Sequence, residues 1–281
     1  MEFFQYDFMQ RALAAGIITA ILCPLIGMFI VIRRQSLLGD GLGHIAFAGV
    51  TGGYLLGIYP AVAAVIVTVL GAMGIEIVRR RHSHHADTTL AIFFYAGIAM
   101  AIIFSTMTRM PSAGLLSFLF GSIITVSLTD VLLIGVVAAV VVVTVGLLFR
   151  QLMLASFDEE IAAVSGVDTQ KISMIFSILT ALVVVVGMMI VGILLVSALM
   201  IVPVAAAHLL GRGFKATLAY AVIFSVVSVI AGLLLSFHWD IAPGGTIVMT
   251  SIIVYLITMI ATYDYGRPYS VLSGHDSSNS E

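Results

Sequence analysis

Residues 171–210 read KISMIFSILTALVVVVGMMIVGILLVSALMIVPVAAAHLL, an apolar stretch with hardly a polar break. A helix that crosses the hydrocarbon core of a bilayer needs about 20 mostly apolar residues. The stretch therefore suffices for two spans, which we place at residues 171–189 and 191–210. One long tilted helix followed by a half-helix is the alternative. Either arrangement makes lipid, and not water, the main solvent of this part of the chain.

The rest of the chain repeats this pattern. Of its 281 residues, 61% are hydrophobic and only 9% are charged, and the mean hydropathy of +1.20 excludes an ordinary soluble domain. We expect an all-α polytopic membrane protein with one permease domain over residues 1–262. About nine transmembrane helices fit this domain, or eight if the stretch above holds only one full span. The other expected spans are residues 9–32, 39–57, 61–78, 88–108, 130–149, 216–236 and 244–262.

The basic residues indicate the orientation in the membrane. With nine spans, every lysine and arginine except Arg11 and Arg109 falls on one side, which the positive-inside tendency makes cytoplasmic. The N-terminus is then outside and the C-terminus inside. The opening residues MEFFQYD are acidic where a secretory signal is basic, so we expect the first apolar run to be retained. Residues 263–281 form a polar cytoplasmic tail that we expect to be disordered.

One segment between the spans is apolar but too short to cross. Residues 111–127, PSAGLLSFLFGSIITVS, are rich in Gly and Ser and lie on the outer side in this topology. Irregular backbone survives at membrane depth only where protein or water satisfies it. The segment therefore predicts a re-entrant or interfacial helix.

Residues 154–171, LASFDEEIAAVSGVDTQK, are the longest polar interruption of the apolar pattern. We expect a cytoplasmic helix over about residues 156–168, with Gly166 near its end. Its acidic residues Asp158, Glu159 and Glu160 suit an N-terminal turn, and its apolar residues Phe157, Ile161 and Val164 form a narrow stripe. Such a helix is suited to insert into a groove on a soluble partner, although an ordinary loop between spans is the alternative.

Asp40 and His44 stand out because an ionisable group inside a membrane helix is costly unless it faces water or a partner. They are four residues apart in GDGLGHIAFAGV, residues 39–50, so both lie on one helical face. A carboxylate oxygen and an imidazole nitrogen suit zinc and the neighbouring first-row ions. In the alternative structural interpretation, Asp40 caps the helix or pairs with Arg33 or Arg34, and His44 bonds a nearby carbonyl.

Other candidate metal ligands are less specific. His208, near the inner end of the expected seventh span, is a candidate for the same ion path, but an interfacial histidine explains it more simply. The loop with His82, His84 and His85 suits weak zinc binding or a solvated anchor. Cys23 is the only cysteine, so the chain has no intrachain disulfide and no thiolate zinc site.

The sequence also lacks the signatures of an enzyme. Its two lysines, Lys171 and Lys215, follow Gln170 and Phe214, so neither belongs to a GxxxxGK[ST] phosphate loop. Neither a GxSxG element nor an HExxH helix is present. We expect no enzymatic activity, no prosthetic group and no nucleic-acid partner, and any ATP hydrolysis must come from another chain.

Six blocks of sequence point to a known family. The first is RRQSLLGDGLGHIAFAGV (33–50), and the others are DTTLAI (87–92), SFLFGSIITV (117–126), SFDEEIAAVSGVD (156–168), VGILLVSALMIVPVAAAHLL (191–210) and DIAPGGTIVM (240–249). In this order they resemble the membrane permease subunits of bacterial zinc and manganese ABC importers, whose first block has the signature R-x-S-x-x-G-D-x-x-x-H-x-x-x-x-G. The resemblance covers nearly the full chain.

This resemblance implies an importer in the bacterial cytoplasmic membrane. It implies a homodimer on two cytosolic ATPase subunits, surrounded by membrane lipids and fed by an extracellular metal-binding protein. Asp40 and His44 become residues that line the translocation path and contact the ion. Block 156–168 becomes the coupling helix that docks into the ATPase, with docking residues Phe157, Asp158, Glu159, Glu160, Ser165 and Gly166.

The identity of the ion is less sharply indicated. Manganese-type members often carry proline where this chain has Ala48, and imidazole suits zinc while manganese prefers oxygen ligands. We therefore expect Zn²⁺, with Mn²⁺ next. Three alternative functions remain: a secondary transporter or channel that needs no ATPase and uses Asp40 and His44 as a proton-coupled site, a permease for a metal chelate, and a non-transporting scaffold.

Overall fold

The computed structural model describes residues 7–81, 86–108, 112–121, 127–211 and 213–263, and within these ranges all regular structure is helical. The all-α prediction is confirmed. The helices are α1 (Asp7–Ile32), α2 (Leu37–Leu56), α3 (Pro60–Arg81), α4 (Ala86–Thr108), α5 (Ser112–Phe120), α6 (Leu128–Phe157), α7 (Glu159–Val164), α8 (Thr169–Val191), α9 (Val196–His208), α10 (Phe214–Trp239) and α11 (Pro243–Tyr263).

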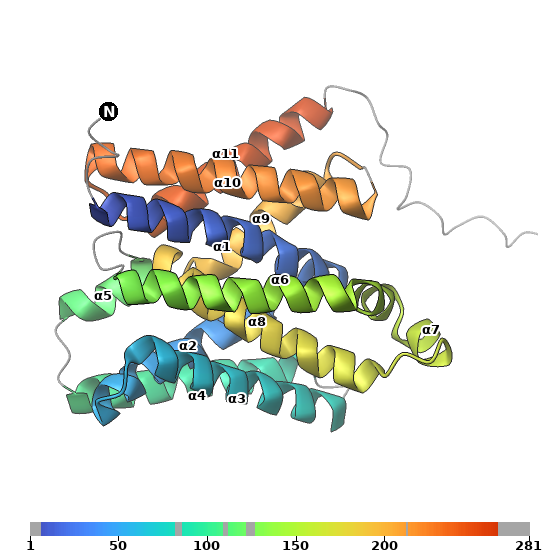
Figure 1. Cartoon of the computed structure of the whole chain (residues 1–281), viewed down its shortest axis with the longest axis horizontal. Helices are drawn as coiled ribbons and strands as arrows, with labels where there is room; N and C mark the ends of the chain where they lie inside the picture. The colour runs from blue at the N-terminus through green and yellow to red at the C-terminus, as the bar shows by residue number, and fades with distance from the viewer. Residues whose placement is uncertain (1–6, 82–85, 109–111, 122–126, 212, 264–281) are drawn as a thin grey trace, which may run out of the picture.

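The long helices form one bundle with α8 near its centre (Figure 1). On one side of α8, helices α2, α3 and α4 pack together, and on the other side α1 packs on α10, which packs on α11. Helix α8 contacts α1, α2, α3 and α6, and most of its residues are buried. The apolar core therefore runs along the full length of α8.

Seven helices in the described part of the chain are long and apolar enough to cross a membrane: α1, α3, α4, α6, α8, α10 and α11. Helix α2 has 20 residues, but Asp40, His44 and six glycines lower its hydropathy. Helix α9 has only 13 residues. Its rise of about 20 Å falls short of the ~30 Å hydrocarbon core. A full span over residues 191–210 is therefore not found, and the count of nine spans is not confirmed.

Residues 192–195 separate α8 from α9 and provide partners for α5. Gly192 has φ +92°, a conformation that strains any residue with a Cβ, so it ends α8. The N–H of Ile193 donates to the carbonyl of Phe118 at 3.0 Å, and that of Leu194 donates to Leu119 at 3.3 Å. The helix expected between residues 111 and 127 is thus present as α5, packed on this break. Its entry into the membrane stays a prediction.

Helix α6 extends further than the expected span over residues 130–149. It begins with a capping box, in which Ser127 accepts a hydrogen bond from the N–H of Asp130 and the Asp130 carboxylate accepts one from the N–H of Ser127. The Tyr59 hydroxyl also donates to Asp130, at 2.6 Å, which ties the loop between α2 and α3 to the start of α6. At its other end the helix continues past the exposed Arg150 to Phe157.

Glycines allow α2 to approach both of its neighbours closely. A Cβ built on Gly49 of α2 lies 2.7 Å from the Cα of Ala64 in α3. A Cβ built on Gly97 of α4 lies 2.9 Å from the backbone carbon of His44 in α2. Real Cβ atoms do not come this close, so only glycine permits these two contacts between helix backbones. Helix α2 is consequently held between α3 and α4.

The contact at Gly97 predicts a specific loss of stability. Gly97→Ala should lower the midpoint of thermal unfolding of the purified permease in detergent, because the added methyl group forces α4 away from α2 at a cost of about 1–3 kcal/mol. Gly146→Ala is the matched control, since a Cβ there meets nothing within 4 Å. Its midpoint should be unchanged or slightly higher, because Ala favours helix more than Gly. Equal midpoints for the two variants would contradict the close packing of α2.

Candidate functional site

The pair of Asp40 and His44 lies in the first two turns of α2. The helix begins at Leu37, and Ser36 occupies the cap position without a side-chain cap hydrogen bond. Asp40 is therefore in the first turn and is not the cap residue, and its negative charge suits the positive end of the helix dipole. Neither Arg33 nor Arg34 is among the ion pairs of the described residues. The structural interpretation of Asp40 as a cap or an ion-pair partner is thus wrong.

Asp40 and His44 occupy the one accessible stripe of the N-terminal half of α2. Between Leu38 and Thr51, every residue is buried except Asp40, His44 and Phe47, which are half-buried. These three residues lie at i, i+4 and i+7, so they share a single helical face. Helices α3, α4 and α8 and the start of α9 cover the remaining faces. The packing of α2 leaves its polar pair half-buried, whereas the other residues between Leu38 and Thr51, except Phe47, are buried.

The surroundings of His44 fix the position of its ring. The Phe94 ring of α4 meets the imidazole edge to face, with ring centroids 4.6 Å apart. One turn further along α4, Gly97 packs on the His44 backbone. Thr51, one turn beyond Phe47, is fully buried, and its hydroxyl donates to the carbonyl of Phe47 at 3.0 Å, so it lies inside the packing and not on the accessible stripe. Side-chain ligands on this face therefore come from Asp40 and His44 alone.

Two ligands from one chain suit transient binding. The described residues contain no group of three or more His, Cys, Asp or Glu side chains placed to hold a metal ion. Tight protein zinc sites usually have three or four protein ligands. A carboxylate and an imidazole on one helix are ligand types that suit a first-row ion, and two such ligands by themselves would hold it only weakly.

The remaining histidines are not brought to this pair. His208 is exposed at the last residue of α9, whereas α9 approaches α2 near its other end, where Ser197 packs on Gly39. His208 follows Ser197 by eleven residues of helix, which corresponds to about 17 Å along the axis. The prediction that His208 shares the path of Asp40 gains no support from this placement. His82, His84 and His85 lie outside the described residues.

A second polar region lies where α1, α3, α6 and α8 meet at the α7 end of the bundle. Arg33, in the turn after α1, donates to Ser156 of α6 at 2.8 Å and to Ser173 of α8 at 3.2 Å. Its guanidinium carbon lies 4.4 Å from the centroid of the Phe176 ring. Burial, reinforced by the positive charge of Arg79, lowers the pKa of Arg33 to about 10. Arg33 remains charged at neutral pH and links three helices.

Helix α7 is shorter than expected. Asp158 is extended, with φ −154°, so it both ends α6 and caps α7, and its carboxylate accepts the N–H of Ile161 at 2.9 Å. Because an aspartate that bonds the backbone in this way favours a cap over a helix interior, the segment breaks there. The expected bounds of 156–168 are wrong: Phe157 belongs to α6, and α7 comprises Glu159–Val164. Ser165 caps it, and Gly166 follows with φ +81°.

The apolar stripe of this segment is exposed. Phe157 is 61% exposed, Ile161 56% and Val164 91%, whereas Ala162 is the buried residue of α7. Helix α7 also projects beyond the end of the bundle (Figure 1). Exposed apolar groups rimmed by Glu159 and Glu160 are typical of a surface that another protein covers. The sequence pattern had indicated this stripe, and the structure leaves it largely exposed, with Phe157 in edge-to-face contact with the Phe214 ring.

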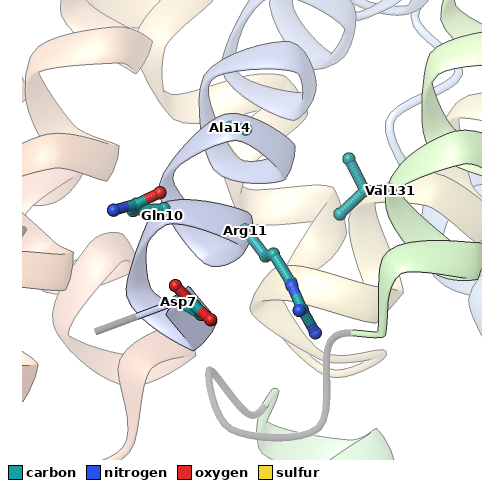
Figure 2. Close-up of a pocket in the computed structure, with 5 residues that line it drawn as sticks. All are labelled: Asp7, Gln10, Arg11, Ala14 and Val131. Atoms are coloured by element: carbon teal, nitrogen blue, oxygen red, sulfur yellow. The ribbon is translucent and has the colours of Figure 1, made fainter. Parts of the chain in front are cut away.

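The sequence did not indicate a pocket at the opposite end of α1. It is an open surface depression and not an enclosed cavity, and it is lined by Asp7, Gln10, Arg11 and Ala14 of α1 and by Val131 of α6. Figure 2 shows the Arg11 side chain directed toward the space between α1 and α6. The i, i+4 spacing of Asp7 and Arg11 was the available signal. Asp40 and His44 are not part of this depression.

A bundle with seven helices long and apolar enough to cross a membrane, within the described part of the chain, is the architecture of a multi-pass membrane protein. More specifically, the chain belongs to the ABC 3 transport family, whose profile matches residues 5–262. The resemblance in the six sequence blocks is therefore confirmed. The chain is a permease of an ABC metal-transport family.

Several relatives are named for metal transport. A probable metal transport system membrane protein of Treponema pallidum is 37% identical over 94% of this chain and 98% of that protein. The manganese transport system membrane protein MntC of Halalkalibacterium halodurans is 34% identical over 89% of this chain and 86% of its own length. The high-affinity zinc uptake system membrane protein ZnuB of Haemophilus influenzae is 29% identical over 90% and 97%.

A solved structure shares the fold. A chain of PsaBC from Streptococcus pneumoniae, solved in complex with Fab, matches with a TM-score of 0.83 and 29% identity. The match covers 92% of this chain and 94% of that chain. The helix arrangement described above is therefore one that a solved structure also adopts.

The contacts of Arg33 predict that charge alone cannot replace it. Arg33→Lys should destabilise the permease by about 1–3 kcal/mol, because lysine cannot bond Ser156 and Ser173 together or stack on Phe176. Arg34→Lys, at the exposed neighbouring residue, is the control and should have little effect. Midpoints of thermal unfolding in detergent measure both. If Arg33→Lys is as stable as the wild type, the three-helix link is unimportant.

Proposed function

We propose that the chain is the permease subunit of an ATP-driven importer that moves a divalent transition-metal ion, Zn²⁺ first and Mn²⁺ next, across the bacterial cytoplasmic membrane. The observation that carries this proposal is the accessible stripe of α2. A carboxylate and an imidazole in a membrane helix are costly unless they face water, an ion or a partner. Here they are the side chains that the packing of α2 leaves accessible.

Weak ligation by this pair suits an ion in transit. A path must bind the ion strongly enough to select it and weakly enough to release it. Asp40 and His44 supply two ligands per chain, and a second copy of the chain or water supplies the others. An extracellular binding protein delivers the ion, and this chain provides the passage. The ion is the substrate and not a resident cofactor.

The preference for zinc rests on ligand chemistry. The relatives include proteins named for manganese and for zinc, so their names leave both ions open. Imidazole suits zinc better than manganese, which prefers oxygen ligands. The buried Ala48 of α2, where manganese-type members often carry proline, supports the same preference.

The exposed stripe of α7 supports a docking role for this end of the bundle. Phe157, Ile161 and Val164 offer apolar area, and Asp158 and Gly166 set the helix ends that present it. The basic residues Arg33, Arg79 and Arg80 gather at the same end, as expected for the cytoplasmic side. We infer that the cytosolic ATPase subunits bind here, that the N-terminus is outside and that the C-terminus is inside.

Replacing either member of the pair should abolish uptake. In cells that express the chain with its ATPase and binding protein, Asp40→Ala or His44→Ala should reduce uptake of radiolabelled zinc by at least about tenfold, because the ion loses a ligand at a two-ligand site. Dimer assembly should be unchanged. His238→Ala, at an exposed histidine near the end of α10, is the control and should keep uptake within about twofold of wild type.

Other outcomes of this experiment discriminate between the alternatives. Undiminished uptake in both variants would show that Asp40 and His44 have a structural role and do not bind the ion. Uptake of manganese in place of zinc would keep the mechanism and change the ion. Uptake that persists without the ATPase would favour the secondary transporter or channel.

Disruption of α7 should separate the permease from its ATPase. Glu159→Ala combined with Gly166→Val should lower the amount of ATPase that co-purifies by at least about tenfold, because valine strains the φ +81° turn that ends α7. Gly57→Val is the matched control, since Gly57 ends α2 with φ +67° and a Cβ there also meets nothing within 4 Å. Unchanged co-purification with the double variant would refute the docking assignment.

A further inference from the structure

Glu76 of α3 is a buried carboxylate remote from the pair of Asp40 and His44 in α2. It is 2% exposed, and its oxygens lie 2.9 Å from Arg79 and 2.8 Å from Arg80, both one turn further along α3. The Ser177 hydroxyl of α8 donates to it at 3.3 Å. A buried charge is tolerable only when it is paired and hydrogen-bonded in this way. These contacts fix the two arginines relative to α8.

Arg80 extends this cluster to two further elements. Its Nη2 donates to the carbonyl of Thr169, the first residue of α8, at 2.8 Å. The same nitrogen lies 3.7 Å from the carboxylate of Glu159 in α7. The guanidinium is suited to this, because it presents five donors in a rigid fork. One side chain of α3 therefore contacts both α7 and α8.

The contacts of Arg80 differ in strength. Glu159 is 56% exposed at its side chain, and the 3.7 Å separation is long, so this ion pair is weak and easily rearranged. The bonds to Glu76 and Thr169 are short and partly buried, so they hold the guanidinium in place. Arg80 is thus firmly attached to α3 and α8 and loosely attached to α7.

Helix α3 is also in close contact with α2, the helix that carries Asp40 and His44. A Cβ built on Gly71 lies 2.8 Å from the side chain of Ile45, the residue after His44. Gly71 is nine residues before Arg80, about 14 Å along the helix. Packed helices transmit displacement with little compression. A shift of the Arg80 end of α3 therefore displaces the side chain of Ile45.

From these contacts we propose that Arg80, held by Glu76, is a positioning residue that transmits the movement of α7 to α2. The proposal rests on the function proposed above, in which α7 binds the ATPase and α2 carries the two ligands of the ion. Movement of α7 reaches Arg80 mainly through the short bond to Thr169, where helix resumes after α7, and to a smaller extent through Glu159. Helix α3 carries the displacement to the side chain of Ile45, the residue after His44. Arg80 neither binds the ion nor takes part in ATP hydrolysis.

The test is the number of ions transported per ATP hydrolysed in proteoliposomes that contain the permease with its ATPase and the metal-loaded binding protein. Arg80→Gln should lower zinc transport at least about tenfold while ATP hydrolysis stays within about twofold of wild type, since ATPase docking is kept and its transmission to α2 is lost. Arg80→Lys should be intermediate, because it keeps one charge for Glu76 but cannot span three partners. Arg81→Gln, at the exposed neighbour, is the matched control and should transport normally.

Folding is checked by the thermal unfolding midpoint and by co-purification of the ATPase. If Arg80→Gln lowers transport and hydrolysis in proportion, or matches Arg81→Gln, the positioning role is overturned. Arg80→Lys keeps the proposal testable if Arg80→Gln fails to fold, and normal transport per ATP in Arg80→Lys would then overturn it. Absence of transport in the wild-type complex would instead overturn the proposed function, and this inference with it.

Discussion

Close backbone contact around α2 is the constraint on which the arrangement of the site depends. Gly49 meets Ala64 of α3, and Gly97 of α4 meets the backbone of His44. No larger side chain fits at either point. Helices α3, α4 and α8 and the start of α9 cover the rest of α2. Between Leu38 and Thr51, only the stripe of Asp40, His44 and Phe47 stays accessible. The position of the polar pair is therefore a result of how tightly the apolar faces pack.

At the α7 end of the bundle, the helices are held together by buried charged groups and not by apolar packing alone. Glu76 is neutralised by two arginines, and Arg33 is bonded to Ser156 and Ser173. In a medium of low dielectric constant, buried charges are tolerated only when they are paired or hydrogen-bonded. The result is a network that joins α1, α3, α6, α7 and α8 at the end of the bundle where we propose that the ATPase subunits bind. The polar pair of α2 and this network are linked through α3.

Sequence reasoning succeeded where the signal is local. Apolar length predicted most of the long helices, and the i, i+4 spacing of Asp40 and His44 predicted that they share a face. Glycine and charge placement predicted a short helix near Glu159. Sequence reasoning failed where contacts with distant residues decide the structure. The N–H groups of Ile193 and Leu194 bond to α5 and interrupt the expected span, and Asp158 divides the segment of about residues 156–168 that was expected to be one helix.

By itself the sequence determined the all-helical class, the family and the two residues that suit an ion, because hydropathy, spacing and motif order are properties of the linear chain. Only the tertiary structure decided which face of α2 stays accessible, that α9 is a half-helix and that Arg80 joins α3 to α7 and α8. The reason is physical: burial and pairing depend on helices distant in sequence, and no local pattern records which of them will meet.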